Sequence, residues 1–150
     1  MTVARSFIDT NVLLRAIVVG MPFHIEAAEL IYQQREAGQE LWISRQVIRE
    51  FLVQVTREQK STQLMNVTQV EETLVFLEAN FQIADETAAV TTRLLQLIKQ
   101  YPTSGKQIHD ANIVATMLVN GIDTLLTQNI DDMKRFEKEI KLIPLKAGSE

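Results

Sequence analysis

The stretch FIDTNVLL, residues 7–14, joins the end of an expected strand to the start of an expected helix. The apolar run Val3–Ile8 predicts a short buried strand that ends just before an aspartate. In open α/β sheets, ligands bind just beyond the carboxyl ends of the strands, and Asp9 would place a carboxylate there. Asp9 or Asn11 could equally cap the helix that follows. The stretch by itself leaves both roles open.

The composition indicates one globular domain. The chain has 150 residues, of which 46% are hydrophobic and 23% charged, enough for one domain with a substantial core. We expect that domain to cover residues 1–146, with a short polar tail at residues 147–150. Because the chain contains no cysteine, a disulfide framework and a cysteine-based zinc site are excluded.

The charge balance argues against a general attraction to nucleic acid. The formal net charge is −4, so an enzyme acting on nucleic acid would need a local basic rim, a second subunit or metal ions to offset phosphate repulsion. No apolar stretch is long enough to span a membrane, and Asp9 and Arg15 do not fit a signal peptide. We therefore expect a cytoplasmic protein without membrane contact.

Beyond the first strand, the chain alternates short β-prone segments with longer helical ones. Further strands are expected at residues 41–43, 81–84, 124–126 and 142–145. Helices are expected at about residues 11–20, 24–37, 44–58, from 68 onward, 85–100, 104–120 and 129–138, with a polar loop at 59–65. This alternation predicts an α/β fold with a mainly parallel central sheet of four to five strands, covered on both faces. The last strand is expected at a sheet edge because it carries Pro144.

Several polar residues are placed to cap these helices. Ser44 is expected to cap the third helix and Asp85 the fifth. Two further pairs have the spacing of a capping box, in which the first residue caps the helix and the second reaches back to it. These pairs are Thr68 with Glu71 and Ser104 with Gln107.

Asp110 departs from the polar face of its own helix. At about 100° per residue, it projects from nearly the same side as Val114 and Met117, roughly 115° from the polar stripe. A partly buried acid needs a partner, because an unpaired buried charge is costly. It could be a structural acid, stabilised by the helix dipole and paired with a lysine or arginine, or it could be a ligand. The polar stripe comprises His109, Asn112, Thr116 and Asn120.

The other candidate positions carry weaker signals. Glu50 lies about 130° from the centre of the apolar stripe of its helix, so periodicity predicts a solvated flank residue. The segment TQNIDD, residues 127–132, follows an expected strand, and its simplest explanation is a helix start capped by Asn129. His24 and His109 match no metal-binding spacing.

The acidic residues at the expected strand ends define a possible chemistry. Carboxylates that converge repel one another, which raises their pKa values unless a cation neutralises them. An all-oxygen site suits Mg²⁺ or Mn²⁺ rather than zinc. Such ions activate water and stabilise an in-line displacement at phosphorus.

Four segments resemble those of PIN domains, and more closely those of the VapC-type toxin ribonucleases of type II toxin–antitoxin systems. The resemblance covers nearly the whole chain in order and spacing, which makes it more specific than any single motif. It implies a PIN-like three-layer α/β/α sandwich. The segments are FIDTNVLL at 7–14, VIREF at 47–51, HDANIVAT at 109–116 and LLTQNIDD at 125–132.

The resemblance also implies a function, a metal-dependent endoribonuclease that hydrolyses RNA phosphodiester bonds with Mg²⁺ or Mn²⁺. Carried over, Asp9, Glu50 and Asp110 would be both catalytic residues and metal ligands. Asn11 and Thr127 would be supporting polar residues. Because the family is commonly homodimeric and neutralised by a small antitoxin, we expect both partners.

The fourth acid is where the chain departs from this family. Many relatives carry an acid two positions after the threonine, where this chain has Asn129. The fourth catalytic acid would then be Asp132, with Asn129 in a supporting role, or it would be missing. Met133 also stands where a phenylalanine usually follows the last acid. These departures bear on a second metal ion rather than on the first.

Two other functions are compatible with parts of the sequence. The main alternative is a non-catalytic PIN-like module that binds RNA or a protein partner. A phosphotransferase of the haloacid-dehalogenase type is disfavoured, because the second aspartate that it needs is Asn11 here. If the chain acts on RNA, its basic rim should include Lys106, Lys134 and Arg135, which flank the acidic segments.

Overall fold

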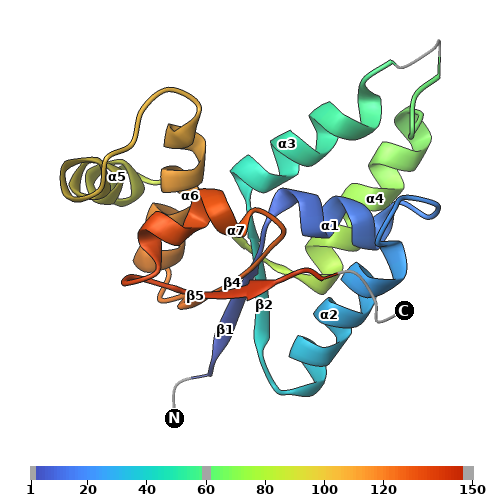
Figure 1. Ribbon diagram of the computed structural model, residues 1–150. Coiled ribbons are helices and arrows are strands. Elements are labelled where there is room, and N and C mark those ends of the chain that lie inside the picture. The colour runs from blue at the N-terminus through green and yellow to red at the C-terminus, as the bar shows by residue number, and fades with distance from the viewer. Residues whose placement is uncertain (1–2, 59–61, 147–150) are drawn as a thin grey trace.

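A computed structural model describes residues 3–58 and 62–146, which contain one sheet of five parallel strands. Helices lie on both sides of this sheet (Figure 1), so the expected α/β fold is confirmed. The strands are β1 (Arg5–Ile8), β2 (Glu40–Ser44), β3 (Gln82–Ala84), β4 (Thr124–Thr127) and β5 (Lys141–Pro144). The helices are α1 (Thr10–Ile17), α2 (His24–Glu36), α3 (Arg45–Thr56), α4 (Val67–Asn80), α5 (Ala88–Gln100), α6 (Gln107–Val119), α7 (Ile130–Met133) and the 3₁₀ helix η1 (Lys134–Phe136).

The strand order, β3-β2-β1-β4-β5, creates a crevice next to β1. The chain moves outward from β1 to β2 and β3 and then crosses back to β4, so the order reverses between β1 and β4. Ile8 of β1 pairs with Leu126 of β4, and the N–H of Asp9 donates to the Leu126 carbonyl at 3.0 Å. Open α/β sheets bind ligands at such a point of reversal, at the carboxyl ends of the strands. Asp9 and Thr127 meet there.

The inner strands are buried, which explains their apolar character. Near-continuous apolar strands are typical of parallel sheets that helices cover on both faces. Val12 and Leu13 of α1 are also fully buried, so the helix that follows Asp9 is anchored in the core. The fully buried strand residues include Phe7, Ile8, Ile43, Leu125 and Leu126.

The predicted capping box of α4 is wrong by two residues. Asn66 is the cap, and its side chain and that of Gln69 form the reciprocal bonds. Asn66 with Gln69 has the same spacing as Thr68 with Glu71, so the local sequence contains two possible boxes. The helix uses the earlier one.

The other predicted caps have mixed outcomes. Ser44 caps α3 and accepts a hydrogen bond from the Val47 N–H at 3.2 Å, as predicted. The cap predicted for α5 is wrong, because the helix begins at Ala88 and Asp85 instead pairs with Arg45 of α3 at 3.0 Å. Before α6, the Gln107 side chain accepts from the Ser104 N–H at 3.1 Å, which is one of the two bonds of the predicted box.

The remaining differences concern segment ends. The helix predicted at 129–138 is shorter, since α7 gives way to η1, and the strand ends shift by one or two residues. Residues 62–65 are not helical, as expected for a loop. The rest of that loop, 59–61, and the predicted tail, 147–150, lie outside the described residues. Among the described helices, none combines the length and the apolar character needed to cross a membrane.

Candidate active site

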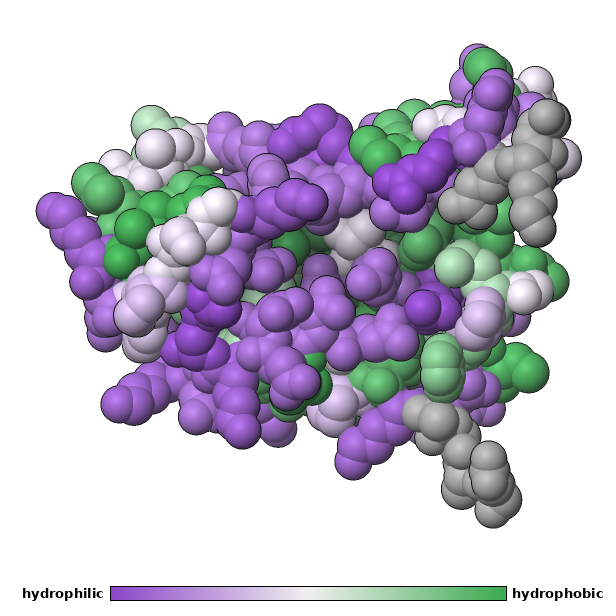
Figure 2. Space-filling model, turned by 45° about the horizontal axis from the view of Figure 1, so that its top comes forward, coloured by the Kyte–Doolittle hydropathy of each residue, from purple (hydrophilic) through white to green (hydrophobic). Residues whose placement is uncertain are grey.

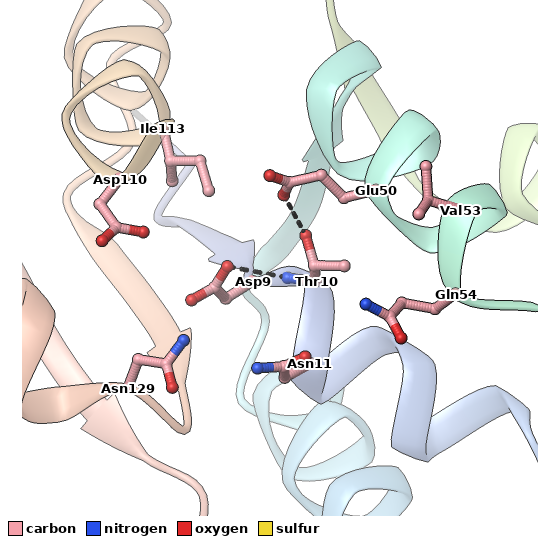
Figure 3. A pocket seen from close by; sticks show the side chains of 9 residues that line it. All are labelled: Asp9, Thr10, Asn11, Glu50, Val53, Gln54, Asp110, Ile113 and Asn129. Atoms are coloured by element: carbon pink, nitrogen blue, oxygen red, sulfur yellow. Dashed lines mark hydrogen bonds between the residues drawn. The ribbon is translucent and has the colours of Figure 1, made fainter. Parts of the chain in front are cut away.

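A cleft of about 270 Å³ opens at the carboxyl edge of the sheet. Figure 2, in which this edge is turned toward the viewer, shows hydrophilic side chains across the middle of the face. Figure 3 shows Asp9 at the centre, with Glu50 on the α3 side and Asp110 on the α6 side. The cleft is lined by Asp9, Thr10, Asn11, Glu50, Val53, Gln54, Asp110, Ile113 and Asn129.

Asp9 caps α1, which is one of the two roles left open by its sequence position, and its carboxylate also lies in the cleft at the strand ends. Its Oδ1 accepts from the Thr10 N–H at the start of α1, and its Oδ2 accepts from the Thr127 hydroxyl, each at 2.8 Å. Burial raises the pKa of Asp9 from 3.8 to about 6. The two hydrogen bonds oppose this rise, and the charges of Asp110 and Glu50 add to it.

Glu50 is held in the cleft, whereas helical periodicity predicted a solvated side chain. The hydroxyl of Thr10 donates to Glu50 Oε1 at 2.7 Å, and the amide of Gln46 lies 3.4 Å from Oε2. The side chain is half-buried. Periodicity measures only the angle from the apolar stripe of α3, and it missed that α1 covers this flank of the helix.

Asp110 lies in the first turn of α6 and is half-buried beside the fully buried Val114 and Met117, which matches the predicted orientation. Burial raises its pKa, and the charges of Asp132 and Glu50 raise it further. The nearby cation of Arg135 opposes the rise, but it is not close enough for an ion pair. Within the described residues, no lysine or arginine pairs with Asp110. The ion pair that a purely structural role of Asp110 would need is therefore not present there.

The polar stripe of α6 is not the solvent face that its composition predicted. Thr116 is 1% exposed, and its hydroxyl donates to the Asn112 carbonyl at 2.8 Å. The Asn112 side chain donates to Gln46 of α3, also at 2.8 Å. This part of the stripe therefore faces the interior, whereas His109 is exposed.

The segment after β4 contributes one buried contact to the site and one acid at its edge. The fully buried Thr127 donates to Asp9 and accepts from the Asn129 N–H at 3.0 Å. Asn129 lines the cleft and precedes α7, but its side chain makes no capping hydrogen bond. Asp132 is exposed and is not among the lining residues, although its charge acts on Asp110. The structure thus places Asp132 at the edge of the site rather than within it.

Sequence reasoning missed several residues of the site. Thr10 contacts both Asp9 and Glu50, and Gln46, which does not line the cleft, contacts Glu50. The signal for Gln46 was available, since residues four apart on a helix are neighbours and Gln46 precedes Glu50 by four. No comparable signal marks Val53, Gln54 or Ile113, which α3 and α6 bring to the cleft wall.

The donor set of the cleft fits a divalent cation that keeps part of its water shell. Carboxylate and amide oxygens line it, and these are ligands that Mg²⁺ and Mn²⁺ prefer. Within residues 3–58 and 62–146, no three or more His, Asp or Glu side chains form a group that could hold a metal ion as they stand. Mg²⁺ usually keeps several waters and binds through one or two carboxylates. Among the described residues Asp110 has no ion pair, and the charges of neighbouring acids add to the effect of burial in raising the pKa of Asp9 and of Asp110, so a bound cation would offset like charges here.

Fold and cleft together define an α/β protein with an acidic site at the carboxyl edge of a parallel sheet. The sequence profile of the PIN domain matches residues 6–139, and the chain belongs to the PIN domain family. Members of this family are nucleases that generally use divalent metal ions. No curated protein matches the sequence significantly.

Solved structures with a similar fold include several toxin–antitoxin complexes. The VapBC2 complex of Rickettsia felis, bound to a promoter DNA fragment, contains a chain with 21% identity and a TM-score of 0.64, covering 94% of this chain and 98% of that chain. A toxin–antitoxin complex from Klebsiella pneumoniae gives 22% identity, a TM-score of 0.65 and the same coverage, 94% and 98%. VapC20 of Mycobacterium tuberculosis, a toxin that cleaves the sarcin–ricin loop, gives 16% identity and a TM-score of 0.65, covering 86% and 93%. At these identities, the likeness shows a shared fold.

Proposed function

We propose that this PIN-domain protein is a metal-dependent endoribonuclease that hydrolyses RNA phosphodiester bonds, and that it is the toxin of a toxin–antitoxin pair. One observation carries the proposal. Asp9, Glu50 and Asp110 come from three separate segments and line one cleft beside the point where the strand order reverses. Burial raises the pKa of Asp9 and that of Asp110, and the charge of Glu50 adds to both rises. Perturbed carboxylates in a cleft are typical of functional sites.

In this proposal, Asp9 and Asp110 are the main ligands of Mg²⁺ or Mn²⁺, and Glu50 is the third acid. A bound divalent cation supplies water activation and charge stabilisation at phosphorus. The chain supplies the orientation of the acids. Thr10 and Thr127 hold the two oxygens of Asp9, and Thr10 also holds Glu50. Neither carboxylate therefore has to change its orientation when a cation binds.

The remaining polar residues of the site have supporting roles in the proposal. Among the described residues, the side-chain amides of Asn11 and Asn129 make no hydrogen bond, although both residues line the cleft. They are therefore free to bind a substrate phosphate or a water. Asp132 is the candidate fourth acid, because its charge reaches Asp110 from the edge of the site.

The substrate is proposed to be RNA, held by a local basic rim because the net charge is −4. Arg135 acts electrostatically on Asp110, and Lys106 lies at the cap position of α6, one turn before Asp110. Lys134 is exposed at the start of η1. These three cations are the proposed rim on the Asp110 side of the cleft.

A small antitoxin and a second copy of the chain are the proposed partners, and the cytoplasm is the proposed location. The antitoxin proposal is supported by the shared fold with chains in toxin–antitoxin complexes from Rickettsia felis and Klebsiella pneumoniae. An arginine of such a partner could enter the cleft and pair with Asp110, which has no ion pair among the described residues, because carboxylates and guanidinium groups form strong charge-assisted pairs. The homodimer proposal rests on the family alone.

The test is Mn²⁺ binding and RNA cleavage by the purified protein and by Asp9→Asn. A total RNA pool is the substrate, and cleavage is mapped by sequencing new 5′ ends. Asp123→Asn is the matched control, because Asp123 precedes β4 at the opposite edge of the sheet. We expect Asp9→Asn alone to lose Mn²⁺ binding and cleavage. A wild-type protein that retains RNA on a column yet neither binds Mn²⁺ nor cuts would support the non-catalytic binding module instead.

A further inference from the structure

Gln46 joins the two helices that face each other across the cleft. It lies in the first turn of α3 and is only 4% exposed. Within the described chain, every hydrogen bond between α3 and α6 passes through its side chain. These two helices carry Glu50 and Asp110, which enter the cleft from opposite sides (Figure 3).

The amide of Gln46 is fully used. Its Nε2 donates to the His109 carbonyl at 2.9 Å and to Glu50 Oε2 at 3.4 Å. Its Oε1 accepts from the Asn112 side chain at 2.8 Å. A buried amide that satisfies both donors and its acceptor has one preferred orientation, because any rotation would leave a buried polar group unpaired. Gln46 is therefore a rigid connection rather than a mobile side chain.

The connection determines where both acids lie. Glu50 is held at one oxygen by Thr10 and at the other by Gln46. Asp110 has no hydrogen bond of its own among the described residues, so its carboxylate is placed only by the backbone of α6. Gln46 binds that backbone at His109, the residue before Asp110.

We propose that Gln46 is a positioning residue that fixes the separation of Glu50 and Asp110, and through it the affinity of the cleft for a divalent cation. The inference rests on the proposed function to the extent that the two acids share that cation. Gln46 is not among the residues that line the cleft, so it acts through the two acids and does not contact the substrate. A purely structural role would make Gln46 a satisfied polar residue that contributes stability alone.

The experiment compares the whole chain with the variant Gln46→Met, which keeps the length of the side chain and removes all three hydrogen bonds. Ser44→Ala is the matched control, because it removes the cap of the same helix, whose oxygen contacts Val47 and no acid of the cleft. The readouts are the Mn²⁺ dissociation constant, from the electron paramagnetic resonance signal of free Mn²⁺, the melting temperature, and kcat and KM for RNA cleavage. Asn112→Ala is a second variant that folds more safely, because it leaves the donors of Gln46 paired.

We expect both Gln46→Met and Ser44→Ala to lower the melting temperature. Only Gln46→Met should raise the Mn²⁺ dissociation constant, by about ten-fold or more, as the loss of a hydrogen bond to a charged group implies. Asn112→Ala should raise the Mn²⁺ dissociation constant by a smaller factor. In Gln46→Met and in Asn112→Ala, kcat should fall by a larger factor than KM rises. The proposal is overturned if Gln46→Met binds Mn²⁺ with the same affinity as Ser44→Ala. If Gln46→Met does not fold, the same comparison is made with Asn112→Ala, and an equal affinity again overturns the proposal.

The outcomes also separate this inference from the proposed function. A wild-type protein that binds Mn²⁺ without cutting RNA would contradict the proposed ribonuclease function. A lower Mn²⁺ affinity of Gln46→Met would still support the positioning role. A wild-type protein that cuts RNA together with a variant of unchanged Mn²⁺ affinity would defeat only the positioning role. If the wild type binds no Mn²⁺ at any concentration tested, both are wrong.

Discussion

The hydroxyl of Thr127 donates to Oδ2 of Asp9 at 2.8 Å and joins two residues that are 118 positions apart in the chain. Thr127 ends β4, and Asp9 directly follows β1, so the bond crosses the crevice where the strand order reverses. The same oxygen accepts from the Asn129 N–H at 3.0 Å. One hydroxyl therefore holds both the carboxylate of Asp9 and the backbone N–H of Asn129.

Thr127→Val should weaken both the fold and the cation site, because valine keeps the shape of threonine and lacks the hydroxyl. The Asn129 N–H and one oxygen of Asp9 lose a partner, at a cost of about 1–3 kcal/mol in the free energy of unfolding. The lost bond also lowered the pKa of Asp9, so that pKa should rise further and Mn²⁺ affinity at neutral pH should fall. Urea unfolding and Mn²⁺ titration measure the two effects. Thr127→Ser, which keeps the hydroxyl, should match the wild type in Mn²⁺ affinity and should lose only the stability contributed by one buried methyl group.

The raised pKa of Asp9 predicts that, without divalent cations, the protein loses stability as pH rises. The pKa is about 6 in the folded protein and 3.8 ordinarily, so between these values the folded state binds a proton that the unfolded state has released. The free energy of unfolding should therefore fall from pH 3.8 to pH 6 and level off above, by about 3 kcal/mol in total. Asp110 contributes in the same direction.

Asp9→Asn isolates this effect, since the contributions of all other carboxylates remain in both proteins. Urea unfolding between pH 4 and 8 in the presence of a chelator should show the wild type losing stability relative to Asp9→Asn as pH rises. Added Mg²⁺ should recover part of that loss in the wild type alone. Parallel curves for the two proteins would mean that Asp9 titrates normally.

Most of the fold could be predicted from the sequence, because parallel strands buried on both faces are continuously apolar and their helices are periodic. Local capping could not be resolved where two boxes overlap, as at Asn66 and Thr68. A helix start is chosen by small local energies, and two residues of shift change little in the core. The predicted fold class is therefore correct even where the predicted helix ends are wrong.

The candidate site was only partly visible in the sequence, for a reason that Glu50 and Asp110 illustrate. Helical periodicity correctly placed Asp110 beside Val114 and Met117, which belong to its own helix. It failed for Glu50, because the group that covers Glu50 is Thr10, 40 positions away on α1. Contacts between elements distant in sequence leave no periodic signal. The family resemblance, rather than the residue spacing, selected Glu50.

The proposed basic rim predicts that Arg135→Ala weakens RNA binding and reduces its salt dependence. Each lost phosphate contact to single-stranded RNA should reduce the slope of log affinity against log salt by about 0.7. Lys106→Ala should act in the same direction. Binding is measured in Ca²⁺, which occupies oxygen sites, with the catalytically impaired Asp110→Asn background as an uncut reference. Lys141→Ala, at the opposite edge of the sheet, is the control and should leave the slope unchanged. An equal effect of Arg135→Ala, Lys106→Ala and Lys141→Ala on the slope would contradict the proposed basic rim.

Asp110→Asn should abolish RNA cleavage without unfolding the protein. Asparagine nearly keeps the shape of aspartate, so packing beside Val114 and Met117 should survive. Since Asp110 has no ion pair among the described residues, its removal breaks none, and the loss of one like charge should leave the stability of the cation-free protein level or slightly higher. The pKa of Asp9 should fall, because the Asp110 charge contributes to its rise.

An acid that only anchored the fold would give the opposite pattern. Breaking a buried ion pair would cost on the order of 3–5 kcal/mol and leave the activity of the folded fraction intact. Thermal melts with and without Mn²⁺, run beside an RNA cleavage assay, distinguish the two. The wild type should gain melting temperature from Mn²⁺, and Asp110→Asn should gain little, because the cation stabilises only the state that binds it. A variant that melts far lower yet cuts RNA at the wild-type rate per folded molecule would remove Asp110 from the catalytic site.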